Sequence, residues 1–206
     1  MFNSKSAPLS VALVSAVLLS VWGQTAFSAT TASKTTTAST AQGVAFSLVL
    51  AADGKTYQVL MKPTKTPKPD ISLSGQVTVK VPHQSAFKAN NVVSAIAGAN
   101  WVEASRVDAP KEDKAADYIS FSFVGLQESS SRTFARTEGN ERVVFSFQNE
   151  GGCVDGVALM AKDDPFNVSP NSASTNPGNY FANLGWGDIS QNNYQGNYGK
   201  AIVCPK

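Results

Sequence analysis

The chain has 206 residues, of which 17 are Lys or Arg and 15 are Asp or Glu, so its formal net charge is +2. This balance excludes a nucleic-acid binder that relies on concentrated basic charge, and it gives no attraction to an anionic membrane. Hydrophobic residues make up 42% of the chain, which is enough for the core of one domain of ordinary size.

The N-terminus has the pattern of a secretory signal peptide. Lys5 supplies a positive charge, an uncharged and mainly apolar stretch runs from Ala7 to Trp22, and Ala26-Phe27-Ser28 offers small residues for cleavage. The alternative is an uncleaved membrane anchor, but a spanning helix needs ~20 apolar residues. We therefore expect residues 1–28 to be removed, and the mature protein to be secreted, at the cell surface or in the periplasm, without membrane contact.

The next segment, residues 29–42, consists mainly of Thr, Ser and Ala. Such low-complexity sequence without a hydrophobic period predicts a flexible spacer. The alternative is a donor strand for a neighbouring subunit, which would need alternating large apolar residues that this segment lacks. Residues 43–206 are then expected to form a single domain.

From Gly43 the apolar residues recur with a period of two, which predicts β-strands. Strands are expected over 44–50, 56–61 and 71–81. Asp53-Gly54 lies between the first two runs and predicts a hairpin turn. Three prolines in residues 62–69 predict a loop, and Gly75 predicts a bulge or a close approach of another segment.

The rest of the chain continues this pattern less regularly. Strands are expected over 101–107, 118–124, 142–148 and 154–161, whereas residues 87–99 fit either a short helix or two weak strands. Many short strands between turn signals predict an all-β fold, an antiparallel β-sandwich of the jelly-roll or cohesin-like kind. Residues 163–200 are rich in Asn, Gly, Ser and Pro, and predict a long irregular C-terminal loop region.

Two cysteines, Cys153 and Cys204, are expected to form a disulfide in an exported chain. The alternatives are two free thiols or a metal pair, but two cysteines and one distant histidine, His83, do not make a zinc site. Ala201-Ile202-Val203 before Cys204 predicts a short terminal strand. Because the irregular region offers little regular hydrogen bonding, the bridge is expected to hold residues 163–200 onto the sandwich.

Several blocks of the mature chain resemble a group of uncharacterised secreted bacterial surface proteins. The strand order also resembles cohesin-type and other carbohydrate-binding sandwiches at the level of pattern. Neither resemblance assigns a chemical role to any residue; the first implies an exported surface module. The blocks are TYQVLMKPT (56–64), ISLSGQVTVKVP (71–82), DYISFSF (117–123), VVFSFQNEGGC (143–153), NSASTNPGN (171–179) and NYGKAIVC (197–204).

Catalytic patterns are sparse. His83 is the one histidine, and there is no phosphate-binding glycine loop and no nucleophile elbow. A glycoside hydrolase needs only two converging carboxylates. The alternative is that the acidic residues of this chain are solvated loop residues. We expect a non-enzymatic protein. The candidate acids are Asp163 with Asp164, Glu112 with Asp113, and Glu138 with Glu141.

Calcium is the one cofactor that the sequence suggests. Asp163, Asp164 and Asn167 place three side-chain oxygens within five residues of a loop, and hard oxygen ligands suit Ca²⁺. The alternative is that the two aspartates make turn or capping hydrogen bonds.

The aromatic and amide residues of the irregular region suggest a ligand site. Flat aromatic faces and amide groups suit sugars, and the alternative is that these aromatics close the open end of the sandwich. We expect an exported binding or adhesion module whose partner is an extracellular glycan or protein. A self-associating structural subunit of a filament or matrix layer is the alternative, and a glycoside hydrolase comes third. The candidate ligand-binding residues are Trp186, Tyr194, Tyr198, Asn183, Asn192 and Asn193.

Overall fold

The structure is a computed structural model that describes residues 41–96, 99–125, 135–188 and 190–206. The predicted signal peptide, residues 1–28, and most of the predicted spacer, residues 29–42, lie outside the described residues. In the described part of the chain, no helix has the length and apolar character needed to cross a membrane.

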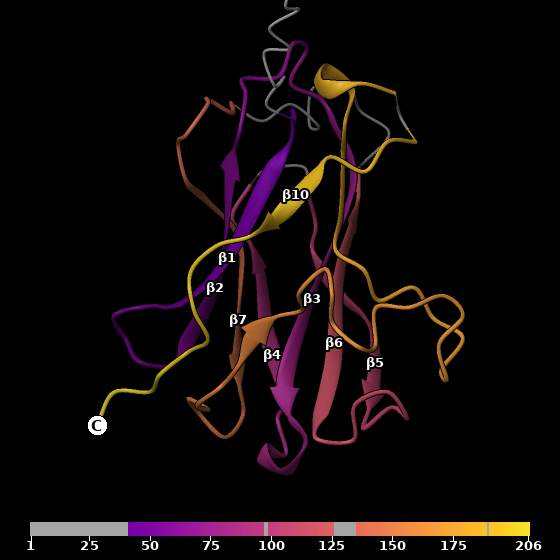
Figure 1. The fold of residues 1–206 in the computed structure, drawn as a ribbon. Coiled ribbons are helices and arrows are strands. Elements are labelled where there is room, and N and C mark those ends of the chain that lie inside the picture. Colours follow the sequence, from indigo (N-terminus) through magenta and orange to yellow (C-terminus); the bar gives the residue numbers. More distant parts are fainter. Residues whose placement is uncertain (1–40, 97–98, 126–134, 189) are drawn as a thin grey trace, which may run out of the picture. The chain divides into compact units, whose positions relative to one another are not determined.

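The domain is a sandwich of two five-stranded sheets, which confirms the all-β prediction (Figure 1). The strand order of the first sheet is β10-β1-β2-β7-β4. Its strands are β1 (Val44–Leu50), β2 (Thr56–Pro63), β4 (Ala89–Ser94), β7 (Arg142–Asn149) and β10 (Tyr194–Asn197). The order of the second sheet is β5-β6-β3-β8, and β9 also pairs with β3. Its strands are β3 (Ser72–Pro82), β5 (Val102–Asp108), β6 (Ala116–Val124), β8 (Ala158–Leu159) and β9 (Tyr180–Asn183).

The core lies between the sheets, where the period-two side chains meet. Burial alternates along β2, so that Tyr57, Val59 and Met61 point inward. Aromatic rings from both sheets fill the centre, and Phe145 lies with its ring centroid 4.7 Å from that of Trp101 and 5.1 Å from that of Phe121. The inward face of each strand thus follows directly from its apolar alternation.

Two turn and packing predictions are confirmed. β1 and β2 form an antiparallel hairpin, and Asp53 closes its turn by accepting hydrogen bonds from the backbone N–H groups of Lys55 and Thr56, each at 2.9 Å. Gly75 makes the predicted close approach, since a Cβ there would lie 3.0 Å from ring atoms of Phe123 and of Trp101. Only a residue without a side chain fits this position.

The structure differs from the sequence prediction in four elements. Tyr180–Asn183 and Tyr194–Asn197, inside the region predicted to be irregular, form the short strands β9 and β10. β10 pairs in parallel with β1, so one pairing of the sandwich is not antiparallel. The strand expected over 154–161 is reduced to the two residues of β8. The terminal strand expected at 201–203 does not form; Ile202 instead exchanges single backbone hydrogen bonds with Gly156 and Val157. Residues 89–94 form β4, and the other two short elements are the 3-10 turns η1 (His83–Ser85) and η3 (Leu184–Trp186).

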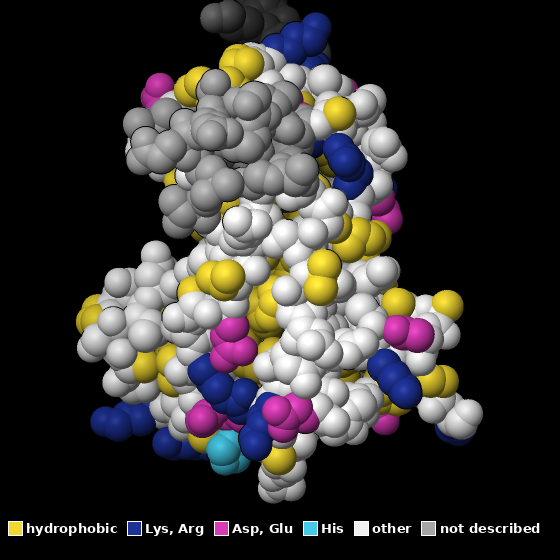
Figure 2. Space-filling view, turned by 180° about the vertical axis from the view of Figure 1, so that it is seen from behind, with side chains coloured by type: hydrophobic (Ala, Val, Ile, Leu, Met, Phe, Trp, Pro, Cys, Tyr) yellow, Lys and Arg dark blue, Asp and Glu magenta, His cyan; other side chains and the backbone are white. Residues whose placement is uncertain are grey.

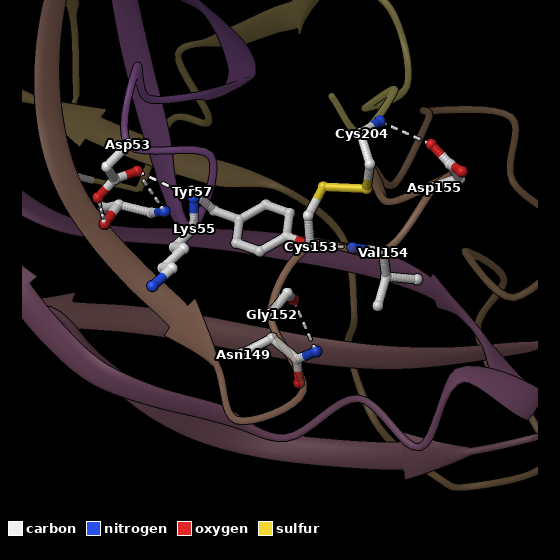
Figure 3. Close-up of a disulfide and its surroundings, with 10 residues drawn as sticks. Asp53, Lys55, Tyr57, Asn149, Gly152, Cys153, Val154, Asp155 and Cys204 are labelled. Carbon is white, nitrogen blue, oxygen red and sulfur yellow. Dashed lines mark hydrogen bonds between the residues drawn. A yellow bond between two sulfur atoms is a disulfide. The ribbon is translucent and has the colours of Figure 1, made fainter. Parts of the chain in front are cut away.

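The predicted disulfide between Cys153 and Cys204 is confirmed (Figure 3). It joins the last residues of the chain to the segment after β7. Around it, the backbone N–H of Cys204 donates to Asp155 Oδ1 at 2.6 Å, and that of Val154 donates to the buried Tyr57 hydroxyl at 2.8 Å. The bridge is therefore part of a wider attachment of the C-terminus to the sandwich.

The irregular region covers part of the outer face of the second sheet. Residues 160–179 pack there over a small second cluster in which Tyr118, Met160 and Phe166 are buried. The backbone N–H of Met160 donates to Thr78 O at 2.8 Å, which fixes the start of this region on β3. The covered outer face is where the candidate site lies.

Candidate functional site

Asparagine side chains hold the irregular region in place. Asn179 is buried; its Nδ2 donates to Met160 O at 2.8 Å, and its Oδ1 accepts from the backbone N–H of Thr78 at 2.8 Å. The Oδ1 of Asn171 accepts from the N–H of Thr175 at 3.0 Å, and its Nδ2 donates to the carbonyl of the same residue at 2.9 Å. An amide can donate and accept at once, so it substitutes for a strand partner.

Three of the six predicted ligand residues are buried at one end of the domain. Trp186 is 5% exposed, and its Nε1 donates to Lys65 O at 3.1 Å. Asn183 and Asn193 are fully buried, and the N–H of Asn183 donates to Asn193 Oδ1 at 2.9 Å. These three side chains present no surface to a ligand, and the position of Trp186 fits the alternative in which the aromatics close the sandwich.

Tyr198 lies apart from the others, beside a smaller hollow that Leu48 and Asn197 also line. Its ring lies beneath Lys62, whose Nζ is 5.6 Å from the ring centroid. Burial, and then the negative charge of Glu141, raises the pKa of Tyr198 to about 12. The structure therefore does not bring Tyr198 together with the remaining predicted residues.

The other two predicted ligand residues, Asn192 and Tyr194, line a pocket of about 400 Å³. Buried Asn179 and Tyr194 contribute to this pocket, while more accessible side chains complete its lining. We call it the amide pocket. Its full lining is Ala161, Lys162, Asn167, Asn176, Gly178, Asn179, Tyr180, Asn192 and Tyr194.

Tyr194 is held rigidly in the amide pocket. Its ring stacks on Phe46 at 5.5 Å between centroids, and Lys162 Nζ lies 5.1 Å from the ring centroid. Its hydroxyl donates to Asn197 Oδ1 at 2.7 Å and accepts from Asn179 Nδ2 at 3.3 Å. Burial raises the pKa of Tyr194. The ring is thus a fixed part of the pocket and not an open stacking platform.

Tyr180 is the accessible aromatic residue at this site, and the sequence analysis did not select it. In the register of the sheet it pairs with Gln76, which pairs in turn with Ser122, so the three residues form one row across β9, β3 and β6. Tyr180 is half-buried whereas Phe181, Ala182 and Asn183 after it in β9 are buried, and no local sequence pattern distinguishes them.

A second pocket of about 360 Å³ adjoins the amide pocket at Tyr180. The two pockets share Asn176, Gly178 and Tyr180. Gln76 fixes the shared segment, because its Nε2 donates to Asn176 O and to Gly178 O, each at 2.8 Å. We call this second hollow the serine pocket. Its lining is Ser74, Gly75, Gln76, Ser122, Phe123, Asn176, Gly178 and Tyr180.

The three predicted calcium ligands have different roles in the structure. Asp164 Oδ2 accepts from Lys80 Nζ at 2.8 Å, and its Oδ1 accepts from the Tyr118 hydroxyl at 2.8 Å and from the N–H of Phe166 at 3.0 Å. Asp163 is exposed, and Asn167 lines the amide pocket. An ammonium thus neutralises Asp164, and the bond from Phe166 is the turn hydrogen bond that the alternative interpretation expects. Among the described residues, no group of His, Cys, Asp or Glu side chains could hold a metal ion.

Two of the predicted carboxylates do converge, but on a lysine. Asp113 Oδ2 lies 2.7 Å from Lys80 Nζ, opposite Asp164. The hydrogen bond from Lys80 lowers the pKa of Asp113, whereas burial, and then Asp164, raises the pKa of Tyr118. Burial lowers the pKa of Lys80, but the hydrogen bonds and charges of its two carboxylate partners raise it more, so the pKa lies above its usual value. Asp113 and Asp164 are therefore two structural carboxylates that share one ammonium.

The remaining predicted acids lie elsewhere. Both carboxylate oxygens of Glu112 accept from Ser172, at 2.7 Å from its N–H and at 2.6 Å from its hydroxyl. Glu141 lies 3.8 Å from Lys62 Nζ. Glu138 is exposed, and its backbone N–H donates to Thr66 Oγ1 at 3.0 Å. The structure gives none of them a carboxylate partner for hydrolysis.

The single histidine lies among charged side chains of both signs (Figure 2). His83 Nδ1 is 2.6 Å from buried Asp117 Oδ1, and Arg106 Nη2 donates to the other Asp117 oxygen at 3.2 Å. Nearby, a hollow of about 500 Å³ separates the edge strands β4 and β5, and burial raises the pKa of its Glu103. Four of the five charged groups that line it are paired: Arg106 Nε donates to Asp108 at 2.7 Å, and Lys88 Nζ lies 3.7 Å from Glu150.

Comparison with known proteins adds no further assignment. No family model, no curated protein and no solved structure matches the chain.

Proposed function

We propose that this protein is an exported, non-enzymatic binding module that holds a glycan at the bacterial cell surface or in the extracellular matrix. The observation that carries the proposal is the amide pocket with Tyr180 at its boundary with the serine pocket. Both pockets lie within or near the size range of about 300 to 1000 Å³ that is usual for small-ligand sites.

The chemistry of this lining suits a polyhydroxylated ligand. In the described part of the chain, the Asn176 side-chain amide and the Tyr180 hydroxyl make no hydrogen bond within the protein, so both can bond to ligand hydroxyls. The half-buried Tyr180 ring offers an apolar face beside them. Amides pair with hydroxyl groups as donor and as acceptor, whereas an apolar ligand would leave them without partners.

The absence of an enzyme activity is part of the proposal, and the state of the acids supports it. Asp113 and Asp164 share an ammonium, and Glu112 is bonded to Ser172. A hydrolase needs one carboxylic acid and one carboxylate that face the same sugar bond. The disulfide Cys153–Cys204 supports an oxidising compartment, in keeping with export.

A structural subunit that assembles through its sheet edges is the second candidate, because an exposed valine lies on one edge strand of each sheet. Val93 on β4 is 58% exposed, and Val102 on β5 is 55% exposed. However, β4 has a bulge between Asn90 and Val93, and β5 has one between Glu103 and Ser105. Bulges and charged residues oppose edge-to-edge pairing. Glycan binding therefore ranks first.

Binding of the secreted protein to a glycan array, followed by calorimetry with the best ligand, tests the proposal. Tyr180→Ala should weaken binding by about tenfold, equivalent to 1.4 kcal/mol, and Tyr180→Phe separates the ring from its hydroxyl. Asn140→Ala is the control, since Asn140 is exposed in a turn and lines neither pocket. Failure of every glycan to bind saturably would refute the proposal. A concentration-dependent polymer seen by sizing and electron microscopy would favour the second candidate.

A further inference from the structure

The amide and serine pockets adjoin each other, because Asn176, Gly178 and Tyr180 line both. We call residues 176–178 the ridge; Gly178 adds no side chain to it, and an added Cβ there would lie 3.0 Å from Asn167 Oδ1. Because Gln76 bonds to the carbonyls on both sides of Pro177, the ridge cannot move easily into either pocket. A ligand that fills one pocket can therefore continue over the ridge into the other.

The two pockets differ in charge. Lys162 lines the amide pocket, and none of the described residues that line either pocket is Asp or Glu. Three other lysines of the described residues lie within 4 Å of an acid, namely Lys62, Lys80 and Lys88. Within the described residues Lys162 has no such ion pair, and its neighbour Asp163 is exposed and outside the lining.

The position of Lys162 directs its charge toward the pocket. Its Nζ lies 5.1 Å from the centroid of the Tyr194 ring, and the opposite face of that ring is occupied by Phe46. An ammonium over an aromatic face is attracted by the ring electrons. Because its side chain is already held there, it loses little conformational freedom when it pairs with an anion. The accessible amide of Asn176 lines the same pocket and can donate to the same anion.

We propose that the ligand is an acidic oligosaccharide of at least two units. A uronate carboxylate lies in the amide pocket against Lys162, and the next sugar crosses the Tyr180 ring into the serine pocket. There Gln76 and Ser122 face its hydroxyl groups; Ser122 Oγ donates weakly to Gln76 Oε1 at 3.4 Å and is easily redirected. This inference rests on the proposed glycan-binding function and specifies the class of glycan.

Calorimetry with the secreted full chain tests the charge. The probes are trimers of galacturonate, glucuronate and mannuronate, each compared with its uncharged methyl ester. At least one acidic trimer should bind about tenfold more tightly than its ester, a difference of 1.4 kcal/mol, and added salt should reduce this difference. Lys162→Gln should remove it, whereas Lys65→Gln, a change at an exposed lysine outside both pockets, should leave it intact.

The same titrations test the two-pocket path. The matching monosaccharide should bind at least tenfold more weakly than the trimer, and Ser122→Tyr, which fills the serine pocket, should reduce trimer affinity to that of the monosaccharide. Equal affinities for acid and ester, or for monosaccharide and trimer, would overturn this inference while leaving the proposed function intact. If neutral and acidic glycans alike fail to bind, the proposed function fails as well. Unchanged melting temperatures of the variants confirm that each remains folded.

Discussion

The sandwich and the irregular region of residues 160–179 reach order by different means. In the sandwich, the burial of aromatic rings holds the two sheets together, as around Phe145 with Trp101 and Phe121. In the irregular region, hydrogen bonds of buried polar side chains hold the chain in place. The amides of Asn171 and Asn179 each bond to backbone groups that lack a strand partner. Irregular chain becomes rigid when side-chain amides satisfy its backbone.

This difference matters for the proposed site. The amide pocket consists of the segment that asparagines hold in place, so its shape is largely established before a ligand binds. A pre-organised site loses less conformational entropy on binding than a mobile loop does. Variants that each remove one stabilising interaction distinguish these two kinds of order.

The largest effect is expected in the core. Phe145→Ala should lower the free energy of unfolding by about 3–5 kcal/mol, because it leaves a cavity beside Trp101 and Phe121. Urea denaturation followed by circular dichroism measures the change. Val93→Ala, at a residue 58% exposed, is the control and should change stability by less than about 0.5 kcal/mol. Equal losses for both variants would contradict the assignment of the core.

Loss of the disulfide should come next. Replacing Cys153 and Cys204 by Ser should lower the free energy of unfolding by about 2–5 kcal/mol. The sequence predicts that residues 163–200 loosen as well. In the structure, however, Tyr198 N–H donates to Phe46 O, and the asparagine side chains hold the irregular region by hydrogen bonds that do not involve the bridge.

Hydrogen exchange locates the effect of this change. We expect early exchange at residues 199–206, while the amide pocket stays protected. Early exchange throughout 163–200 would instead show that the disulfide, and not the asparagine side chains, holds the irregular region. Free-thiol titration of the denatured, unreduced wild-type protein is the control, and it should detect no reactive thiol.

A smaller loss is expected when one asparagine is removed from the irregular region. Asn179→Ala leaves the buried N–H of Thr78 without its partner, which should cost about 1–3 kcal/mol, while the carbonyl of Met160 keeps the hydrogen bond from Asn197 Nδ2 at 2.9 Å. Asn176→Ala, at an exposed neighbour with no side-chain hydrogen bond in the described residues, should cost less than about 0.5 kcal/mol. Thermal melts distinguish the two, and similar losses would show that burial of the amide is unimportant.

The smallest effect concerns acid. Hydrogen bonds from Thr56 and Lys55 lower the pKa of Asp53 from 3.8 to about 2. A carboxylate whose pKa is lower in the folded state stabilises that state above its unfolded pKa, and this stabilisation disappears as the pH falls through the folded pKa. The melting temperature should therefore fall between pH 4 and 2, and Asp53→Asn should show a smaller fall. An equally steep fall in the variant would assign the acid sensitivity to other carboxylates, such as Asp113.

The sequence alone predicted the elements whose contacts are local or repetitive. Apolar alternation over residues 44–50 and 71–81 defined strands and their buried faces, because successive side chains of a strand point in opposite directions. Asp53-Gly54 predicted the hairpin from turn chemistry. Two cysteines allow a single pairing within the chain, so the bridge between Cys153 and Cys204 followed from their number.

The tertiary structure alone decided which polar residues meet. Lys80 and Asp164 are 84 residues apart, so no local pattern indicated that an ammonium would neutralise the predicted calcium ligand. The sequence also left open which aromatic side chains are exposed, because aromatic residues suit both a core and a binding surface. In the structure Trp186 is buried, whereas Tyr180 is accessible between two pockets. The proposed site depends on β9 pairing with β3, a contact whose register is set by the packing of the whole second sheet.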